Sequence, residues 1–309
     1  MADTSMLPQA LVDRVAALLQ RADHVLIAAG AGMSVDAGFD YNSERQFVSR
    51  YPVLARSGPR CRYHVFGYPF PIRDASGLPP YGPLRGASGA LVDLAAQWGH
   101  MARHLEELRI APPPDATPYT ALAALTAGKS RFVLTSNADD LFERMGYDAA
   151  ALWTRQGSYS RLQCLGACHP ESVWSALEWI PRAAAAVDLA TERLHDPALH
   201  PRCARCGGVA MMNVRGGDWF IETPYEPQGR RFATWLGGAQ RGRLLVLDVG
   251  TGFNTPSVIR WPAEQIVARH PDAHLVRVNL HHPEVPRELG DRALSLRTTG
   301  AALWAALGG

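Results

Sequence analysis

The sequence predicts an α/β protein whose parallel sheet is interrupted by two insertions. Three observations lead to this fold class: strand-like apolar runs alternate with helical stretches, the alternation occurs in three separate blocks, and irregular stretches rich in proline, glycine or cysteine lie between them. The chain has 309 residues, enough for two domains. We assign the sheet domain to residues 1–39, 116–155 and 241–309, and a smaller domain to 40–115 and 156–240.

The first block opens with a helix followed by a strand. Apolar residues recur at helical spacing within residues 9–22, at Leu11, Val12, Val15, Leu18 and Leu19. The run 24–29 reads His-Val-Leu-Ile-Ala-Ala, which predicts a buried strand. Small residues from Gly30 to Gly38 then form a turn whose backbone N–H groups could reach a phosphate at a helix start. A tight connection between strand and helix is the alternative interpretation.

The alternation stops after this turn and later resumes twice. Residues 40–115 are rich in proline, glycine and aromatic residues, and contain a long loop and one helical stretch at 89–109. The second irregular part, 156–240, contains helical stretches near 171–194 and 228–240. The other predicted elements are helices at 117–128, 139–146, 262–269 and 298–307, and strands at 131–135, 152–154, 243–249 and 274–279.

Composition and charge exclude two classes of partner. The chain carries 31 basic and 29 acidic residues, which gives a formal net charge of +2. This balance predicts neither a nucleic-acid surface nor attraction to an anionic membrane. The chain lacks an apolar run of about 18 residues, and its beginning lacks the basic and apolar regions of a secretory signal. We therefore expect a soluble, cytoplasmic protein.

Four of the five cysteines form two close pairs. Three residues separate Cys164 from Cys168, two separate Cys203 from Cys206, and 34 residues lie between the pairs. Two such chelating pairs supply the four thiolates of a tetrahedral zinc site and leave no position for water or substrate. The spacing therefore predicts one structural zinc ion per chain.

Alternatives remain open for these cysteines. Four unrelated buried thiols are one alternative, and replacement of a ligand by the nearby His169 or His200 is another. The fifth cysteine, Cys61, lies between Arg60 and Arg62, but a lone cysteine is more often packed than reactive. We assign no role to Cys61.

Four segments, in order along the chain, resemble the sirtuins, a family of NAD-consuming protein-modifying enzymes. Gly30-Ala-Gly-Met-Ser34 followed by Gly38 resembles the family's GAG-x-S-x3-G loop, and Thr135-Ser-Asn-Ala-Asp139 resembles its TQNID segment. Gly250-Thr-Gly252 resembles its GTS turn, and Val278-Asn279 ends a strand as its IN segment does. The cysteine quartet falls where the family carries a zinc ribbon.

The resemblance covers about residues 10–300, and within it 40–115 and 170–200 are supported only by position. It implies a Rossmann-like, sirtuin-type domain that binds NAD as co-substrate, and a small domain with a helical module carrying the cofactor loop and a zinc-binding module. In such a sheet, ligands lie outside the carboxyl ends of the strands, and each of the four motifs follows or ends a predicted strand. The implied NAD site therefore lies in one cleft.

The resemblance assigns residues to the parts of this site. Those expected to hold the pyrophosphate are Gly30, Ala31, Gly32 and Ser34. Those expected to hold the adenosine half are Gly250, Thr251, Gly252 and Asn279. Those expected around the nicotinamide ribose, and assigned to catalysis, are Asn137, Asp139 and Gln156. Further NAD contacts are expected from Gly38, Asp40, Tyr41, Asn254, Thr255 and Leu280.

Three departures from the sirtuin deacetylases bear on the chemistry. Their general base is the histidine of an H-G pair, which here reads Gln156-Gly157. Their GIPDFR becomes Gly38-Phe-Asp-Tyr-Asn42, which keeps an acidic and an aromatic position but lacks the arginine, and Gly252-Phe-Asn-Thr-Pro256 differs from their continuation of GTS. These features resemble the microbial class M sirtuins, which are associated with protein ADP-ribosylation.

The chemistry of glutamine points in the same direction. Glutamine can orient a ribose by hydrogen bonds, but it does not titrate near neutral pH and cannot take a proton. Breaking the bond between nicotinamide and C1′ needs a shaped, water-excluding pocket more than a base. Loss of the histidine is therefore expected to preserve cleavage while redirecting ADP-ribose to an external nucleophile.

The sequence thus predicts an NAD-dependent protein ADP-ribosyltransferase. By resemblance, a lipoyl-type carrier protein is one candidate acceptor, and a macrodomain hydrolase would be a functional partner. One alternative is an NAD-dependent lysine deacylase in which His64 or a water replaces the missing base. An inactive NAD or ADP-ribose sensor is a further alternative.

Overall fold

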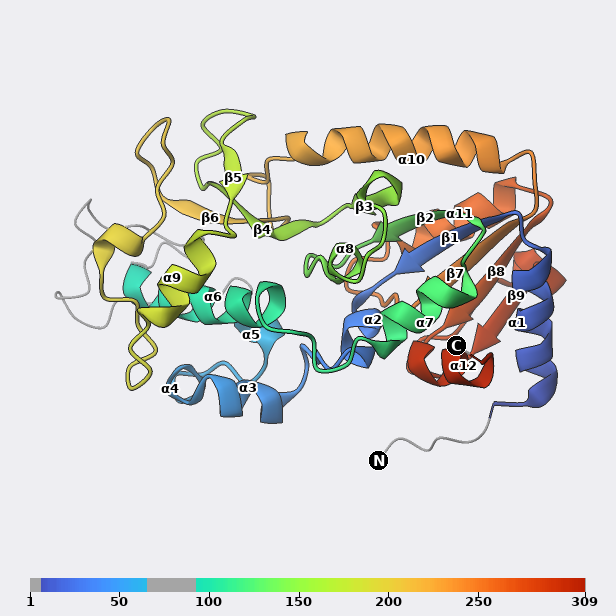
Figure 1. Ribbon diagram of the computed structural model, residues 1–309, viewed down its shortest axis with the longest axis horizontal. Helices are drawn as coiled ribbons and strands as arrows, with labels where there is room; N and C mark the ends of the chain where they lie inside the picture. Colours follow the sequence, from blue (N-terminus) through green and yellow to red (C-terminus); the bar gives the residue numbers. More distant parts are fainter. Residues whose placement is uncertain (1–6, 66–92, 309) are drawn as a thin grey trace. The chain divides into compact units, whose positions relative to one another are not determined.

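The computed structural model describes residues 7–65 and 93–308, and the chain forms two compact units. Unit 1 comprises Met1–Phe39, Pro114–Gly157 and Tyr225–Gly309, and unit 2 comprises Asp40–Pro113 and Ser158–Pro224. The predicted second insertion, 156–240, is therefore divided, because its last helix belongs to unit 1. Each unit combines segments that are far apart in the sequence (Figure 1).

Unit 1 is built on a six-stranded sheet in which all neighbouring strands are parallel. The strands are β1 (His24–Ala29), β2 (Ser130–Thr135), β3 (Leu152–Thr154), β7 (Leu244–Val249), β8 (Ala273–Val278) and β9 (Ala293–Leu296). Their order across the sheet is β3-β2-β1-β7-β8-β9. The predicted α/β fold with a parallel sheet is confirmed.

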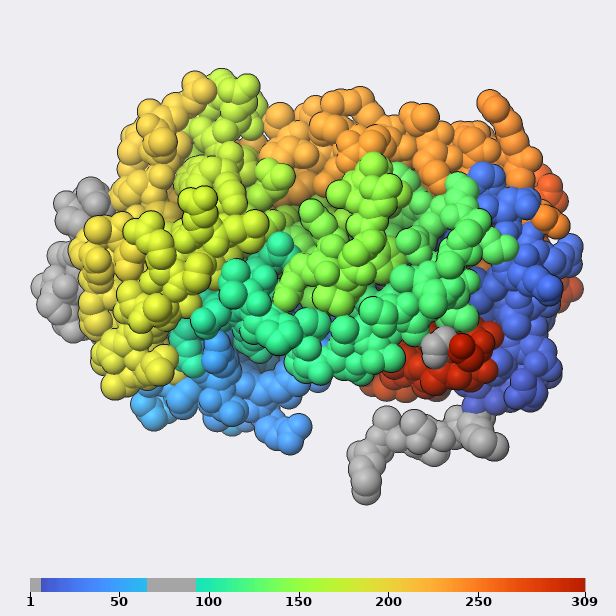
Figure 2. Space-filling view, viewed as in Figure 1, coloured from blue at the N-terminus to red at the C-terminus, as the bar shows by residue number. Residues whose placement is uncertain are grey.

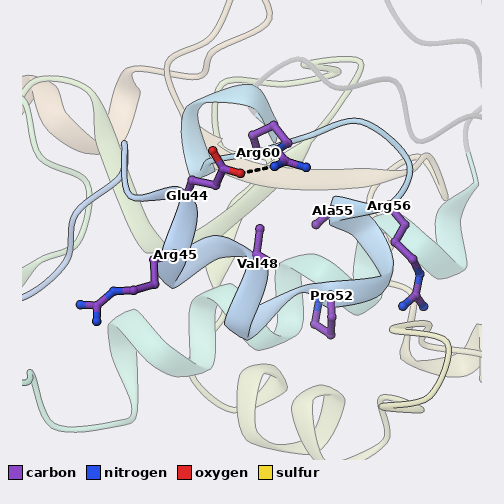
Figure 3. Close-up of a pocket in the computed structure, with 7 residues that line it drawn as sticks. All are labelled: Glu44, Arg45, Val48, Pro52, Ala55, Arg56 and Arg60. Atoms are coloured by element: carbon purple, nitrogen blue, oxygen red, sulfur yellow. Dashed lines mark hydrogen bonds and ion pairs between the residues drawn. The ribbon is translucent and has the colours of Figure 1, made fainter.

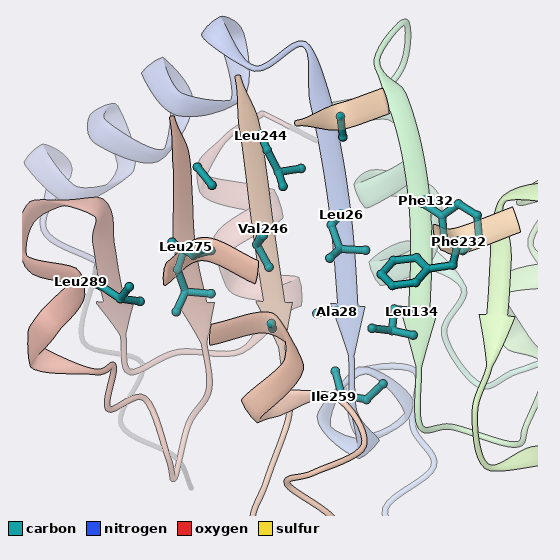
Figure 4. Close-up of a cluster of buried hydrophobic side chains, with 14 residues drawn as sticks. Leu26, Ala28, Phe132, Leu134, Phe232, Leu244, Val246, Ile259, Leu275 and Leu289 are labelled. Carbon is teal, nitrogen blue, oxygen red and sulfur yellow. The ribbon is translucent and has the colours of Figure 1, made fainter. Parts of the chain in front are cut away.

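The central strands are buried on both faces, as expected for a parallel sheet between helices. Every residue of β7 is buried, and in β1 only His24 is partly exposed. One face of the sheet supplies Leu26 and Val246 to an apolar cluster that also includes Phe232 and Ile259 (Figure 4). The apolar runs of the sequence therefore form the core of unit 1, and the core holds the strands whose carboxyl ends carry the sequence motifs.

Helices of unit 1 cover both faces of this sheet. They are α1 (Gln9–Arg21), α2 (Ala31–Asp36), α7 (Thr117–Leu125), α8 (Leu141–Arg144), α10 (Glu226–Ala239), α11 (Arg260–Arg269) and α12 (Gly300–Ala306). Short 3₁₀ helices occur at η2 (Ala149–Ala151) and η5 (Arg287–Arg292), and η4 (Thr223–Tyr225) spans the point in the chain where unit 2 ends and unit 1 resumes. The helices α10 and α11 pack on the face that carries the apolar cluster, and α1, α7 and α12 lie on the other side (Figure 1).

Two elements of unit 1 differ from the sequence prediction. The helix expected at 139–146 is reduced to α8, because Asp140 before it has a left-handed backbone with φ of 55° and Gly146 after it has φ of 83°. The strand β9 was not predicted, since its four residues carry too short a pattern. The other predicted helices and strands of this unit are present with small shifts at their ends.

Unit 2 combines helices of different lengths with a three-stranded sheet. Its helices are α3 (Glu44–Arg50), α4 (Pro52–Ala55), α5 (Arg62–Val65), α6 (Leu94–Arg109), α9 (Trp179–Ala185) and the 3₁₀ helix η3 (Pro197–Leu199). Its sheet has the order β5-β4-β6, from β4 (Gly157–Cys164), β5 (Val173–Ser175) and β6 (Ala210–Val214). The helix predicted at 89–109 is α6 in the described part. The long loop predicted at about 40–85 is wrong over residues 40–65, where the chain forms α3, α4 and α5, and the rest of it lies outside the described residues.

The prediction of helix near 171–194 was largely wrong. Residues Val173–Ser175 form β5 and pair antiparallel with β4, and helix is confined to α9. The chain then turns at Glu192, which has φ of 56°. The Glu192 carboxylate accepts hydrogen bonds from the backbone N–H groups of Val53 and Leu54 in α4, at 3.1 and 2.8 Å. A contact between distant segments therefore replaces the local helix.

A buried polar cluster in unit 2 links α5 to α6. Arg62 is 2 % exposed and donates to His104 Nδ1 at 3.0 Å and to Glu107 at 2.7 Å. The rings of His100 and His104 stack 5.7 Å apart. Desolvation, reinforced by the charge of Arg62, lowers the pKa of His100 to about 3 and also lowers the pKa of His104. The two imidazoles therefore pack as neutral rings beside the Arg62 cation.

Candidate functional site

The sequence motifs of unit 1 follow strands that end at one level of the sheet. Ala29 of β1 is in register with Thr135 of β2 and with Val249 of β7. Thr135 is in turn in register with Thr154 of β3, and Val249 with Val278 of β8. The loops that begin at these residues therefore leave the same edge, the carboxyl end of a parallel sheet, where ligands of such folds bind.

Three glycines bring two of these loops into backbone contact. A Cβ atom on Gly30 would lie 2.6 Å from the carbonyl oxygen of Gly250, and one on Gly32 would lie 2.5 Å from the Gly250 Cα atom. Gly250 has φ of 66°, a left-handed conformation that favours glycine. The close approach is held by a hydrogen bond from Gly32 N–H to the Gly250 carbonyl at 3.1 Å.

Backbone N–H groups of the glycine loop were expected from the sequence to reach a phosphate, and this contact changes that expectation for two of them. The N–H groups of Gly30 and Gly32 donate to the carbonyl oxygens of Val249 and Gly250, at 2.9 and 3.1 Å. These two donors are therefore used within the protein. The glycines are needed here because they permit the β1 and β7 loops to touch.

Asp139 and Asn137 are tied to the glycine loop by side-chain hydrogen bonds. The Ser34 hydroxyl donates to Asp139 Oδ2 at 2.5 Å, and Asp139 Oδ1 accepts from the backbone N–H of Leu141 at 3.0 Å. Asn137 Nδ2 donates to the Gly30 carbonyl at 2.9 Å. Ser34, Asn137 and Asp139 are 2 %, 8 % and 2 % exposed. The structure brings these three predicted residues together in a buried, ordered arrangement.

Gln156 follows β3 and has an unsatisfied side-chain oxygen. It comes two residues after Thr154, as Asn137 comes two residues after Thr135, and these two strand ends are in register. Its Oε1 atom is buried and has no hydrogen-bond partner in the described part of the chain. A buried, unpaired carbonyl oxygen costs free energy unless a ligand donates to it. The position is therefore suited to receive a hydroxyl or amide donor.

Thr251 and Asn279 connect the loops after β7 and β8. Asn279 Nδ2 donates to the Thr251 carbonyl at 2.8 Å, and its Oδ1 accepts from the N–H groups of His281 and His282 at 3.0 and 2.9 Å. Thr251 and Asn279 are both buried, at 3 % and 8 % exposed. Three other predicted residues are more accessible: Asn254 and Thr255 are exposed, and Leu280 is half-buried.

A buried ion-pair network beneath these loops was not predicted. Asp248 of β7 and Arg277 of β8 are register partners, both are fully buried, and their side chains approach to 2.7 Å. Asp248 also accepts from the Thr251 hydroxyl at 2.5 Å. Desolvation raises the pKa of Asp248, while the charge and hydrogen bonds of Arg277 and Thr251 oppose this rise. A charged residue near the end of each of two apolar strands is the sequence signal for this pair.

Gly38, Asp40 and Tyr41 form the connection that leads out of the glycine loop. Gly38, in unit 1, has φ of 93°, and a Cβ atom there would lie 2.7 Å from Pro114. Asp40 and Tyr41 belong to unit 2. Asp40 accepts from the N–H of Asn42 at 2.9 Å. Tyr41 is buried, with its ring 6.0 Å from that of His104.

The cysteine quartet forms a compact cluster in unit 2. The sulfur atoms of Cys164, Cys168, Cys203 and Cys206 all lie within 4.8 Å of one another. The sulfur atoms of Cys164 and Cys206 are 3.6 Å apart, and those of Cys168 and Cys203 are 3.7 Å apart. Ligands placed tetrahedrally at a Zn–S distance of about 2.3 Å would be about 3.8 Å apart, so the cluster has the dimensions of a closed zinc site.

Local backbone structure prepares these sulfurs. Gly207 has φ of 70°, and the N–H of Gly208 donates to the Cys206 sulfur at 3.4 Å.

The two histidines considered as alternative zinc ligands have other hydrogen-bond partners. His200 Nε2 lies 2.7 Å from the Leu194 carbonyl, and His169 Nδ1 accepts from the N–H of Glu171 at 3.2 Å.

We expect one zinc ion per chain in the purified protein. Elemental analysis by mass spectrometry checks this, and Cys206→Ser should lose most of the metal because three thiolates remain. Cys61→Ser is the matched control, since Cys61 is buried outside the quartet. Native protein without zinc, or equal zinc in both variants, would contradict the assignment.

A separate pocket of about 500 Å³ lies on unit 2. It is lined by Glu44, Arg45, Val48, Pro52, Ala55, Arg56 and Arg60. Figure 3 shows Arg60 turned toward Glu44, with which it forms an ion pair, while Arg45 and Arg56 extend away in different directions. The arginines therefore do not converge on one ligand, and none of the predicted site residues lines this pocket.

The described helices include none that is both long and apolar enough to cross a membrane. Figure 2 shows residues of α1 (blue) and of α10 (orange) on the surface of unit 1.

No family model matches the chain. Curated relatives do. The chain is 33% identical over 95% of its length to a protein of Fusarium oxysporum f. sp. cubense named "Probable bifunctional ADP-ribose hydrolase/ADP-ribosyltransferase", of which it spans 46%. It is 26% identical to a "Protein ADP-ribosyltransferase" of Staphylococcus aureus, over 90% of this chain and 81% of that one. It is also 29% identical to an "NAD-dependent protein deacylase" of Methylococcus capsulatus, over 86% and 85%.

Solved structures share the fold. A mutant Sir2 homologue in complex with ADP ribose matches with a TM-score of 0.55 and 17% identity, covering 97% of this chain and 95% of the other. A second mutant of a Sir2 homologue, also in complex with ADP ribose, gives a TM-score of 0.55 at 16% identity, over 98% and 97%. At such low sequence identity these matches show the fold alone, and the chain has the fold of the Sir2 homologues.

Proposed function

The chain belongs to the sirtuin family, and we propose that it is an NAD-dependent protein ADP-ribosyltransferase. The chain spans less than half of the Fusarium relative. Its activity, its substrates and the roles of its individual residues are therefore all part of the proposal. Two relatives named for ADP-ribosyl transfer support it.

The observation that carries the proposal is Gln156. It occupies the position where the deacetylase pattern has a histidine, and its buried Oε1 atom has no partner in the described part of the chain. Such an oxygen can accept a hydrogen bond from a ribose hydroxyl, but the amide cannot take a proton. A site with this residue can orient the ribose of NAD and lacks the base that deacylation requires.

The residues present fit NAD as the substrate. Gly30, Gly32 and Gly250 bring the loops after β1 and β7 together at the carboxyl edge of the sheet, where the pyrophosphate of a dinucleotide binds in such folds. Asn137, held by its bond to the Gly30 carbonyl, and Asp139, held by Ser34, would position the nicotinamide ribose. Thr251 and Asn279 would hold the adenosine half.

NAD supplies an activated glycosidic bond. In the transfer, the C1′–N bond breaks and its electron pair leaves with nicotinamide, while the acceptor's nucleophile bonds to C1′ and releases a proton to solvent. The protein's part is to orient the ribose, exclude water and stabilise developing charge with fixed dipoles. Buried side chains already fixed by hydrogen bonds, as Ser34, Asn137 and Asp139 are, meet this need without reorganising.

The acceptor in this proposal is a protein, and a lipoylated carrier is the first candidate. We also propose a macrodomain hydrolase as a functional partner that removes the modification. The name of the Fusarium relative, which joins an ADP-ribose hydrolase and an ADP-ribosyltransferase in one chain, supports this pairing. The cytoplasm is the proposed location, because its reducing conditions keep cysteines available for zinc.

A lysine deacylase is the second candidate, favoured by the relative from Methylococcus capsulatus that carries this name. It would need a replacement for the missing base. His64, considered for this role, is exposed in unit 2, and its Nδ1 accepts from the N–H of Arg60 at 3.2 Å.

One experiment separates these functions. The protein is incubated with NAD and either a lipoylated carrier protein or an acetylated peptide, and nicotinamide, modified protein and O-acetyl-ADP-ribose are measured by mass spectrometry. We expect nicotinamide release coupled to ADP-ribosylated carrier. Robust O-acetyl-ADP-ribose formation would favour the deacylase, and tight NAD binding without nicotinamide release would indicate a sensor.

A further inference from the structure

An exposed aromatic ring lies directly after the Gly250-Thr-Gly252 turn. Phe253 is 54% exposed, although large apolar side chains are usually buried. It sits on the loop that leaves β7 at the carboxyl edge of the sheet, one residue after Gly252. No role was assigned to it by the sequence motifs.

The ring is held in place on the protein side. The guanidinium carbon of Arg260 lies 4.4 Å from the centroid of the Phe253 ring, within the range of a cation–π interaction. His282, on the loop after β8, meets the ring at 5.1 Å with an interplanar angle of 83°, an edge contact. Two loops of the site therefore support a single exposed ring.

Arg260 is itself rigidly anchored. It is the first residue of α11 and is only 3% exposed. Its guanidinium donates to the carbonyl oxygens of Thr251, His282 and Glu284, at 3.1, 3.0 and 2.8 Å. The position of the Phe253 ring is thus coupled to Thr251, a residue of the proposed adenosine subsite.

The contact with His282 is fixed in a similar way. The backbone N–H of His282 donates to Asn279 Oδ1 at 2.9 Å, and Asn279 Nδ2 donates to the Thr251 carbonyl at 2.8 Å. Every support of the ring therefore leads back to Thr251 or Asn279. An aromatic side chain that is exposed but held from below and from its edge is preorganised to stack on a flat ligand.

We propose that Phe253 is the stacking platform for the adenine base of NAD, and that Arg260 is the positioning residue that holds it. The inference rests on the proposed function, because it takes NAD as the substrate. Adenine is a planar π system, and stacking on an aromatic side chain needs no hydrogen-bond readout of the base. Base–aromatic stacking gives about a tenfold or greater change in affinity when the ring is removed.

The test measures the affinity of ADP-ribose, which contains adenine, and of nicotinamide mononucleotide, which lacks it, by isothermal titration calorimetry. Phe253→Ala should weaken ADP-ribose binding about tenfold or more and leave nicotinamide mononucleotide unchanged. Phe253→Trp should restore ADP-ribose binding. Trp261→Ala is the matched control, because Trp261 is 47% exposed on α11 and has no place in this arrangement.

Arg260→Lys tests the positioning role. Lysine keeps the charge but cannot donate from a planar fork to three carbonyls. We expect a higher KM for NAD and weaker ADP-ribose binding, with kcat for nicotinamide release little changed. A merely structural role would instead lower thermal stability and kcat together.

Equal ADP-ribose affinity of Phe253→Ala and the parent protein would overturn the proposal, as would equal weakening of both ligands. These outcomes are independent of the transferase assay. If the parent binds ADP-ribose through Phe253 but modifies no acceptor, the proposed function fails while the stacking role stands. If the parent modifies the acceptor but Phe253→Ala binds ADP-ribose as tightly as the parent does, the proposed function stands and the stacking role fails.

Discussion

Replacing Asn137 by alanine is expected to reduce nicotinamide release about a hundredfold to a thousandfold, the range observed when one preorganised polar group is removed from an active site. Asn137 is buried, and its side chain donates to the carbonyl of Gly30 at 2.9 Å. The substitution removes both the proposed contact with the ribose and this connection between the β2 and β1 loops. Measurement of nicotinamide release at saturating NAD checks the prediction.

Gln156→Ala provides the comparison for Asn137→Ala. It removes an amide whose Oε1 atom has no partner in the described residues, so no protein hydrogen bond is lost through that atom. We expect a smaller loss of nicotinamide release than with Asn137→Ala and little change in thermal stability. If Asn137→Ala retains parental activity while folded, the assignment of the nicotinamide end of the site is wrong.

The second large effect is expected from Gly32→Ala. The added Cβ would lie 2.5 Å from the Gly250 Cα atom, a backbone atom in the residue that directly follows β7, which pairs with β1. Overpacking of this kind costs about 1–3 kcal/mol in free energy of unfolding, occasionally more. We expect a clear fall in thermal unfolding temperature together with loss of ADP-ribose binding, because the β1 and β7 loops must separate.

Gly252→Ala is the control for this effect. Gly252 lies two residues from Gly250 in the same loop, and a Cβ atom there has no neighbour within 4 Å. Its unfolding temperature should stay near that of the parent. Equal destabilisation by Gly32→Ala and Gly252→Ala would show that general loop rigidity, and not the backbone contact, determines stability.

Most of unit 1 could be predicted because its signals are local. Apolar runs such as His24–Ala29 and Leu244–Val249 are buried on both faces, and each of these two is followed by a glycine at the sheet edge. The cysteine spacing likewise contains the geometry of a four-ligand site, and the sulfurs do converge. Where a few consecutive residues determine the structure, the sequence sufficed.

Unit 2 was harder because distant contacts decide its local structure. The alanine run at the end of α9 favours a longer helix by propensity, but the chain turns at Glu192, whose carboxylate accepts hydrogen bonds from two N–H groups of α4. The strand β5 exists because it pairs with β4. The local sequence pattern shows neither the contact of Glu192 with α4 nor the pairing of β5 with β4, so the prediction of helix near 171–194 was wrong.

The missed network around Asp248 shows a signal that a sequence does carry. Asp248 and Arg277 each stand just before the end of a predicted apolar strand, where a lone charge would be costly. Opposite charges at matching positions of two such strands indicate neighbouring strands in register, which the structure confirms. The contacts that hold the Phe253 ring, in contrast, come from Arg260 and His282 on other segments and could not be foreseen.

The parallel pairing of β1 with both β2 and β7 has a consequence for how the protein matures. β1 ends at Ala29, whereas its partners end at Thr135 and Val249, with the segments of unit 2 between them. Pairing over such separations is slow, because loop-closure entropy is lost before any contact forms. The loops after β1, β2 and β7 therefore come together only when these distant strands have paired, and a newly made chain can bind its ligand only after that pairing. A nucleotide that binds only this finished state would also protect it from unfolding.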